Sequence, residues 1–244
     1  MITLPPALHA LTNHAAKENS RYAIAGIGVW DTECRGFPER VCCSTDGRRL
    51  AMFRCAKAPE WPCIPGEKGF IIPADLIIGL GRPMLAKRAD DFARYTATLD
   101  PGGVVLSLTL GKKTVIGQAI DGAFPPVEEV IPNRDNPPIG GVIVFSAAFI
   151  KDAAVLIHEL HRFNTAHEGK TPMEWRHYAP GKPAVICAGM DLRGFGCCLV
   201  ESVVMPLAQP GSDLGKSAYE AAYEAAHKPE KPEKAKKATE PVAA

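Results

Sequence analysis

The stretch Ser44-Thr45-Asp46-Gly47-Arg48-Arg49-Leu50-Ala51 lies between two apolar runs and is the strongest structural signal in the chain. Asp-Gly is a strong turn pair, because glycine accepts a positive φ and aspartate can hydrogen-bond to its own backbone. We therefore predict a β-hairpin formed by Val41 to Ser44 and Arg49 to Cys55, with the Arg49 guanidinium beside exposed apolar groups. Taken alone, the stretch is more readily explained as an ordinary hairpin, because such turns are common.

Length and composition limit the number of domains and the classes of protein to which the chain can belong. The chain has 244 residues, of which 46% are hydrophobic, so it can bury a substantial core and form one or two domains. No apolar run approaches the roughly 18 residues that a membrane span needs. The first residues, Met1 to Pro6, lack the basic and apolar regions of a signal peptide. We expect a cytoplasmic protein without a membrane partner.

The cysteines show no disulfide or zinc pattern. None forms a C-x-x-C pair, and their positions are 34, 42, 43, 55, 63, 187, 197 and 198. Cys42-Cys43 and Cys197-Cys198 lie in apolar, strand-like stretches, where thiols behave as small buried hydrophobes. We expect reduced, structural thiols and no metal.

Three blocks repeat along the chain, each with a helix-like stretch followed by strand-like runs. The first block is predicted to contain a helix over Pro5 to Lys17, with Leu8 and Leu11 inward, and strands near Tyr22 to Trp30, Val41 to Ser44 and Arg49 to Cys55. The second is predicted to begin at Gly69 to Pro73, with a helix over Ala74 to Leu80 and strands near Phe92 to Leu99, Val104 to Leu110 and Thr114 to Ile120. This pattern predicts an α+β fold with mostly antiparallel sheets.

The third block is predicted to open at Val142 to Phe145 and to contain the clearest helix, Ser146 to Arg162. Ser146 can cap its start, and the apolar residues of one face are Phe149, Ile150, Ala153, Leu156, Ile157 and Leu160. Strands are expected near Met173 to Tyr178, Ala184 to Ala188 and Gly196 to Met205. The predicted domains are therefore 1–132, a linker at 133–141, a single module at 142–207, and a disordered tail at 208–244 with a possible short helix.

A metal-dependent hydrolase is the main alternative from the residues alone, because His158, Glu159, His161 and His167 cluster in sequence. Their spacing is not H-E-x-x-H, and the helix dipole favours histidines near a helix C-terminus without any metal. The chain has no G-x-x-x-x-G-K-[ST] phosphate loop. We predict no catalytic residue, no cofactor and no enzyme activity.

Two later phrases extend the Thr45 hairpin into a pattern. Ile120-Asp121-Gly122-Ala123-Phe124-Pro125-Pro126 runs into Val130-Ile131-Pro132, and Val203-Val204-Met205-Pro206-Leu207 follows near the end. In this order the three phrases resemble the β sliding clamp of bacterial DNA polymerase III. The resemblance covers Leu4 to Leu207 and corresponds to the middle domain of a clamp followed by the last half of its third domain. It implies repeated modules of one helix and antiparallel strands.

The resemblance also implies an interdomain cleft that binds peptides. The matching positions are Ile24, Thr45, Gly47, Arg48, Arg49, Leu50, Pro132, Val203, Val204, Met205, Pro206 and Leu207. Arg48 departs from the family's usual histidine, and Leu207 replaces the usual second methionine with an apolar group of similar size. The implied partners are DNA polymerase or repair proteins that dock through a short peptide containing Gln and Leu or Phe.

In the clamp family the helices line a hole around duplex DNA. The candidate DNA-facing residues here are Lys17, Arg21, Arg82, Lys87, Arg88, Lys151 and Arg162, and a plain solvated surface explains them equally well. The formal charge of +1 gives no strong pull toward nucleic acid, although a closed ring needs only a weakly positive lining. The resemblance implies a homo-oligomer that could encircle DNA, with a possible clamp loader. The alternative is an open, non-encircling adaptor or a competitor of a full-length clamp.

Overall fold

The computed structural model describes residues 1–17, 22–34, 36–66, 68–83, 94–127, 130–131, 145–164, 173–178, 183–192 and 195–206. The predicted linker and the C-terminal tail lie outside these residues. Within them, no helix is long and apolar enough to cross a membrane.

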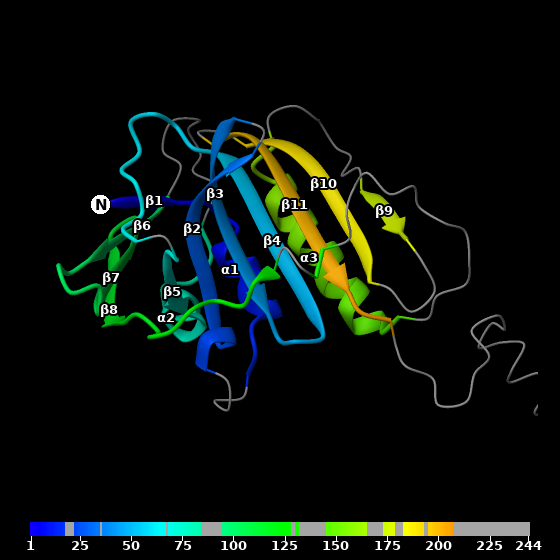
Figure 1. The fold of residues 1–244 in the computed structure, drawn as a ribbon, viewed down its shortest axis with the longest axis horizontal. Coiled ribbons are helices and arrows are strands. Elements are labelled where there is room, and N and C mark those ends of the chain that lie inside the picture. The colour runs from blue at the N-terminus through cyan, green and yellow to red at the C-terminus, as the bar shows by residue number, and fades with distance from the viewer. Residues whose placement is uncertain are drawn as a thin grey trace, which may run out of the picture.

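A seven-stranded antiparallel sheet forms the centre of the molecule (Figure 1). Its strand order is β5-β2-β3-β4-β11-β10-β9, so strands from the start and the end of the chain meet at β4 and β11. The strands are β2 (Gly26–Cys34), β3 (Phe37–Thr45), β4 (Arg49–Ala56), β5 (Phe70–Pro73), β9 (Glu174–His177), β10 (Ala184–Leu192) and β11 (Gly196–Val204). The predicted third block therefore continues the sheet of the first block directly.

A four-stranded antiparallel sheet lies at the end of the molecule opposite to β9 (Figure 1). Its order is β1-β6-β7-β8, and its strands are β1 (Ile2–Leu4), β6 (Tyr95–Leu99), β7 (Val105–Leu110) and β8 (Lys113–Gln118). The outer edge of β6 is thus covered by the first residues of the chain.

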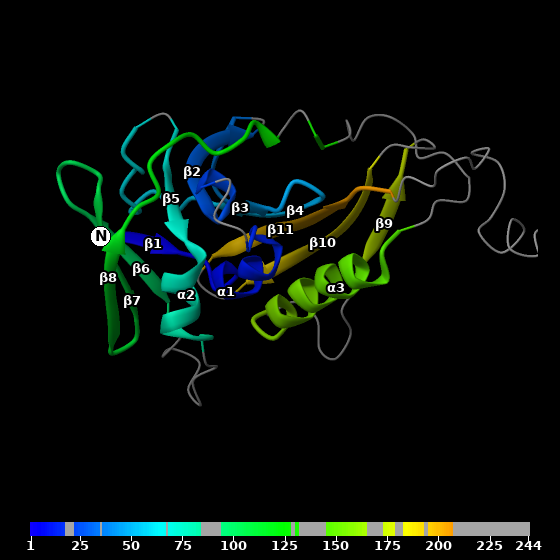
Figure 2. The ribbon, with the colours of Figure 1, turned by 90° about the horizontal axis from the view of Figure 1, so that it is seen from below.

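The helices lie together on one face of the seven-stranded sheet, as Figure 2 shows. They are α1 (Leu8–Leu11), α2 (Ala74–Leu80) and α3 (Ala147–His161), with short 3-10 turns at Thr12–His14 and Tyr22–Ile24. Their apolar residues pack with one face of the strands in the main core, which includes Leu8, Leu11, Ile77, Leu156 and Leu160. The opposite face of the sheet holds a second, smaller cluster, which the segment containing Phe124 and Val127 covers.

The predicted α+β fold with repeated helix-plus-strands modules is confirmed. The first module contains α1 with β2, β3 and β4, the second α2 with β6, β7 and β8, and the third α3 with β9, β10 and β11. Leu8 and Leu11 are buried as expected, and so are Ala153, Leu156, Ile157 and Leu160 of α3. The pattern of apolar residues was therefore a reliable guide to the modules.

Several boundaries differ from the predictions. The helix predicted over Pro5 to Lys17 is shorter, because α1 ends at Leu11 and gives way to a 3-10 turn. Residues Tyr22–Ile24 form another 3-10 turn where a strand was expected, and β1 was not predicted at all. Ser146 occupies the N-cap position of α3 but its side chain makes no capping hydrogen bond. Cys197 is exposed, whereas Cys42, Cys43 and Cys198 are buried as predicted.

Candidate docking site at a sheet seam

The turn between β3 and β4 is held by its own polar side chains. The Thr45 hydroxyl donates to the carbonyl oxygen of Arg49 (2.7 Å) and accepts from the backbone N–H of Gly47 (3.1 Å). Oδ1 of Asp46 accepts from the backbone N–H groups of Arg48 (2.9 Å) and Arg49 (3.1 Å). Gly47 has φ of 84°, a left-handed conformation that glycine adopts without steric cost. The Asp-Gly signal thus produces a well-defined turn.

The end of β11 lies directly beside this turn. Leu50 pairs with Val203 and Arg49 pairs with Val204 across the antiparallel β4–β11 ladder. One residue later, the backbone N–H of Met205 donates to the carbonyl oxygen of Arg48 (3.2 Å). We call this junction of the Thr45–Leu50 turn and the Val203–Pro206 segment the seam.

Residues of the seam alternate between the two faces of the sheet, as the pleat requires. Leu50 and Val203 belong to the second cluster and are only 3% and 1% exposed, whereas Val204 belongs to the main core under the helices. Gly47 and Arg48 are exposed, and Met205 is 36% exposed. The exposed residues of the seam are therefore Gly47, Arg48 and Met205, whereas Leu50 and Val203 are packed with Val127 in the second cluster.

Arg49 points to the helix side and connects three parts of the chain. Its Nε contacts Oδ2 of Asp46 (3.0 Å), its Nη1 donates to the carboxylate of Asp152 in α3, and its Nη2 donates to the carbonyl oxygen of Asn13 (2.8 Å). Its guanidinium also lies over the ring of Phe149, 4.8 Å from the centroid. Each of the three guanidinium nitrogens of Arg49 therefore has a hydrogen-bond partner within the chain.

A cavity of about 740 Å³ opens beside Arg49 on the helix side. Its wall combines charged groups of both signs with an apolar patch, and its residues include Lys17, Arg49, Asp75, Ile78 and Asp152. Ile78 of α2 is well exposed there. The cavity adjoins the seam through Arg49.

The remaining predicted cleft residues are placed only in part. Ile24 lies in the 3-10 turn before β2 and is buried, and Pro206 is partly buried after the end of β11. Pro132 and Leu207 lie outside the described residues. The structure thus brings together the hairpin and the β11 residues, as the resemblance implied, but shows some of them as parts of the core.

The described candidates for DNA contact lie on the helix side. Lys17 follows the first 3-10 turn, Lys151 lies in α3 and Arg162 caps its end, and all three are exposed. Arg82 is exposed but its Nη1 forms an ion pair with Oε1 of Glu159 in α3 (3.0 Å). Arg21, Lys87 and Arg88 lie outside the described residues.

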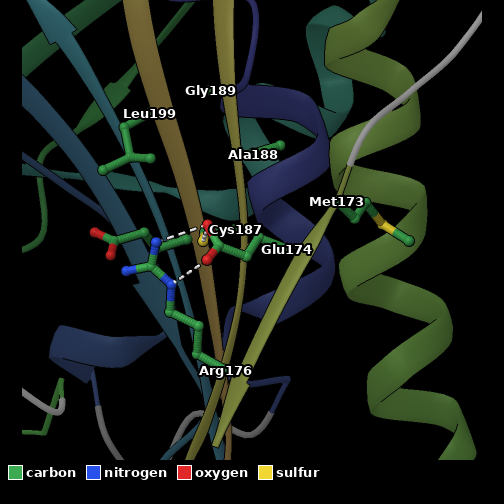
Figure 3. A pocket seen from close by; sticks show the side chains of 8 residues that line it. Met173, Glu174, Arg176, Cys187, Ala188, Gly189 and Leu199 are labelled. Atoms are coloured by element: carbon green, nitrogen blue, oxygen red, sulfur yellow. Dashed lines mark hydrogen bonds and ion pairs between the residues drawn. The ribbon is translucent and has the colours of Figure 1, made fainter. Parts of the chain in front are cut away.

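A second cavity, of about 300 Å³, lies on the sheet near β9 (Figure 3) and was not predicted from the sequence. Arg176 makes two hydrogen bonds of 2.6 Å to the carboxylate of Glu174, and these bonds lower the pKa of Glu174 below its usual value. The pocket forms beside Gly189, which contributes no side chain. No motif marked this cavity, because its residues come from separate strands and are brought together only by the sheet register.

His158, Glu159 and His161 of the sequence cluster lie in the last turn of α3. His158 is exposed on α3, and Glu159 is engaged with Arg82. Among the residues that the structure describes, no three His, Cys, Asp or Glu side chains lie close enough together to hold a metal ion. His167 lies outside those residues.

Comparison with known proteins gives a clear result for the fold. No protein-family model and no curated protein matches the sequence. The structure resembles the β sliding clamp of Caulobacter crescentus, with a TM-score of 0.58 and 18% identity over 85% of this chain and 65% of the clamp chain. It also resembles the DNA polymerase III β subunit of Bartonella birtlesii bound to griselimycin, with a TM-score of 0.57 and 17% identity over 84% and 63% of the two chains.

A more distant likeness is to the β subunit from the DNA polymerase of Streptococcus pyogenes, with a TM-score of 0.52 and 10% identity. The chain spans less than two-thirds of the length of these clamps. At such identities the comparisons establish the architecture, and the residue-level roles need separate arguments. This chain therefore has the fold of the bacterial DNA polymerase III β sliding clamp.

Proposed function

We propose that this protein is a clamp-type binding platform of DNA replication or repair, and not an enzyme, and that it receives short peptide segments of partner proteins at the seam. The observation that carries the proposal is the β4–β11 pairing, which sets the Thr45–Leu50 turn against Met205. Partners of this class are DNA polymerases or repair proteins that act in the cytoplasm. The clamp fold supports this assignment.

The energetics favour weak, exchangeable binding. A Leu and a Phe side chain inserted at the seam would each contribute about 1.5 to 3 kcal/mol by burial. Micromolar affinity needs about 8 kcal/mol, so backbone hydrogen bonds to an extended peptide must supply part of the rest. Exchange of partners on one platform follows from such an affinity.

The test is a titration of the full chain into a labelled synthetic peptide that contains one Gln followed by Leu and Phe, monitored by fluorescence anisotropy. We expect saturable binding, weakened at least about tenfold by Met205→Glu, because a carboxylate at the rim opposes insertion of an apolar anchor. Thr98→Glu, on the exposed face of β6, should leave binding unchanged. Equal affinities of the two variants, or no saturable binding of the wild type, would reject the seam as the peptide docking site.

Encirclement of duplex DNA by an oligomer, with the helix side inward and a loader to open it, is the second part of the proposal. Lys17, Lys151 and Arg162 support it, because they are exposed on that side. A ring should be retained on circular DNA at high salt and released after the DNA is cut. Lys151→Ala combined with Arg162→Ala should reduce this retention, and Lys113→Ala on β8 should not.

An open adaptor that keeps the seam but does not encircle DNA is the alternative. The Arg82–Glu159 ion pair favours it, because it removes one positive charge from the helix side. An adaptor, unlike a ring, should bind the peptide normally and show no difference between circular and linear DNA.

A further inference from the structure

Two cysteines face each other across the strand pair that joins the first and third modules. Cys55, near the end of β4, lies directly opposite Cys198, near the start of β11, and the two strands run side by side at the centre of Figure 1. Both side chains belong to the main core on the helix side and are only 1% and 2% exposed. The two residues are far apart in the sequence, so the pair exists only through the β4–β11 register.

The hydrogen bonds of this ladder identify the kind of pair that the cysteines form. The backbone N–H of Met205 donates to the carbonyl oxygen of Arg48, so these two opposed residues are a hydrogen-bonded pair. Hydrogen-bonded and non-hydrogen-bonded pairs alternate along an antiparallel ladder. Counting back through the unbroken register makes Cys198 and Cys55 a non-hydrogen-bonded pair. The Cα atoms of such pairs are about 4.5 Å apart, within the range of roughly 4.4 to 6.8 Å that a disulfide spans.

The two thiols are also neighbours as side chains. The hydrogen-bonding contact with the Cys55 thiol, together with burial, raises the pKa of Cys198 well above its usual value. Each sulfur atom also lies near a backbone carbonyl oxygen, that of Arg40 for Cys55 (3.7 Å) and that of Gly196 for Cys198 (3.2 Å). The backbone register and the side-chain contact therefore agree that the sulfur atoms of Cys55 and Cys198 lie next to each other.

The other cysteines of the sheet lack this geometry. In the strands that the structure describes, the register places no other two cysteines opposite each other. Cys42 is buried on the same side, but it faces Phe53 and lies diagonally to Cys55. Diagonal neighbours are about 7–8 Å apart, too far for a disulfide without movement of the backbone. Cys42 is therefore a matched control for the Cys55–Cys198 pair.

We propose that Cys55 and Cys198 are a modification site, at which a small disulfide such as oxidised glutathione converts the two thiols into a reversible cross-strand disulfide. One cysteine, after losing its proton, attacks the oxidant and forms a mixed disulfide, and the glutathione thiolate that leaves takes up the proton. The second cysteine, also deprotonated, attacks the protein sulfur of the mixed disulfide and releases the other glutathione as a thiol. Two protein thiols are thus oxidised to one disulfide, and one glutathione disulfide is reduced to two thiols.

Burial makes this exchange slow, because only a thiolate that the oxidant can reach attacks it. The pair lies at one end of the ladder, so separation of the last residues of β4 from the first residues of β11 is enough to expose it. The seam lies at the other end, at Val204↔Arg49, roughly 20 Å away at the rise of a strand. The disulfide therefore ties β11 to β4 without covering the seam, and the inference does not rest on peptide docking.

The experiment identifies the linked residues by mass spectrometry. The full chain with Cys197→Ser, which removes the exposed neighbour of Cys198, is oxidised with glutathione disulfide under native conditions. Remaining thiols are then alkylated in denaturant, and the chain is digested with trypsin. We expect a linked pair of peptides containing Cys55 and Cys198, lighter than the two thiol peptides by two hydrogen atoms and separated again by dithiothreitol. Its absence after prolonged oxidation, or linkage of Cys55 to Cys42 instead, overturns the proposal.

Variants and thermal unfolding test the effect on the fold. Cys55→Ala in the same background should abolish the linkage, and Cys42→Ala should preserve it. The oxidised parent chain should melt at least about 5 °C above its reduced form, because the disulfide closes a long loop of the unfolded chain. The Cys55→Ala chain should melt at the same temperature with and without oxidant. A linked chain that melts no higher than the reduced chain would show that the pair does not fit a disulfide in the native fold, and so overturns the proposal.

Discussion

Arg49 and Asp152 form an ion pair that ties the turn before β4 to the helix α3, although 103 residues separate them in the chain. The same guanidinium contacts Asp46 and the carbonyl oxygen of Asn13. A residue that sequence analysis assigned to a peptide cleft thus also holds the first and third modules together. Its roles in stability and in binding have to be measured separately.

Replacing Arg49 by alanine should lower the free energy of unfolding by about 1–3 kcal/mol, because it removes several charge-assisted hydrogen bonds and leaves Asp152 partly buried without its partner. Urea unfolding followed by circular dichroism measures this change. The neighbouring Arg48 is exposed, so Arg48→Ala should stay within about 0.5 kcal/mol of the wild type. Similar losses in the two variants would contradict the structural role of Arg49.

Arg40 is completely buried and is expected to be the charged side chain most sensitive to substitution. It donates to both carboxylate oxygens of Asp31 (2.8 and 3.1 Å) and to the carbonyl oxygens of Thr3 (2.8 Å) and Pro62 (2.7 Å). Arg40→Leu should cost about 3–5 kcal/mol, because it leaves two carbonyl groups without their donor and reduces the partners of the Asp31 carboxylate to Lys57 and the backbone N–H of Ile64. Combining it with Asp31→Leu should recover part of the loss in urea unfolding. A loss of unfolding free energy below about 1 kcal/mol in Arg40→Leu would show that the hydrogen bonds of Arg40 are not needed for stability.

Gly69 should not tolerate even alanine. It has φ of 67°, and a Cβ atom there would lie 2.0 Å from the carbonyl oxygen of Val29. Gly36 also has a positive φ, 81°, but a Cβ atom there meets nothing. Gly36→Ala should therefore cost about 1 kcal/mol through the backbone alone, and Gly69→Ala clearly more, through the added clash. Thermal melting of the two variants compares these costs directly, and equal shifts would contradict the clash.

His14 should make the protein less stable in mild acid. Burial, with the nearby Arg49 guanidinium, lowers the pKa of His14 from 6.5 to about 4. Because the folded-state pKa lies below the unfolded one, protonation favours the unfolded chain. The stabilisation is complete above pH 6.5 and falls by about 3 kcal/mol as the pH decreases toward 4.

The measurement is the urea midpoint between pH 7 and pH 4. His14→Leu should flatten this dependence, whereas His158→Leu, at an exposed position of α3, should keep the wild-type slope. An unchanged slope in His14→Leu would assign the pH dependence to other groups.

Much of the fold was readable from the sequence because apolar periodicity is local. The face of α3 and the turn at Asp46-Gly47 were both identified this way. The boundaries of α1 and β1 were missed, since β1 exists only by pairing with Tyr95 to Ala97 far along the chain. The local pattern of apolar residues cannot identify a strand partner that lies so far away in the chain.

The candidate site was readable only through the family resemblance. That resemblance implies that the Thr45 turn lies beside Val203, and the β4–β11 register agrees with this placement. It did not show that Leu50 and Val203 would be covered by the chain's own second cluster. Burial depends on which segments cross the sheet, here the one around Val127, and such crossings leave no local signal.

The position of β11 has a consequence for biosynthesis. Strand β11 (Gly196–Val204) comes long after β4 (Arg49–Ala56) in the chain, so during translation β4 keeps an open edge until β11 has left the ribosome. Such long-range pairing is slow to form, and an uncovered strand invites pairing with nascent neighbours. A chain whose synthesis stops before β11 would therefore lack the β4–β11 pairing and would expose β4 as an unpaired edge strand that can aggregate.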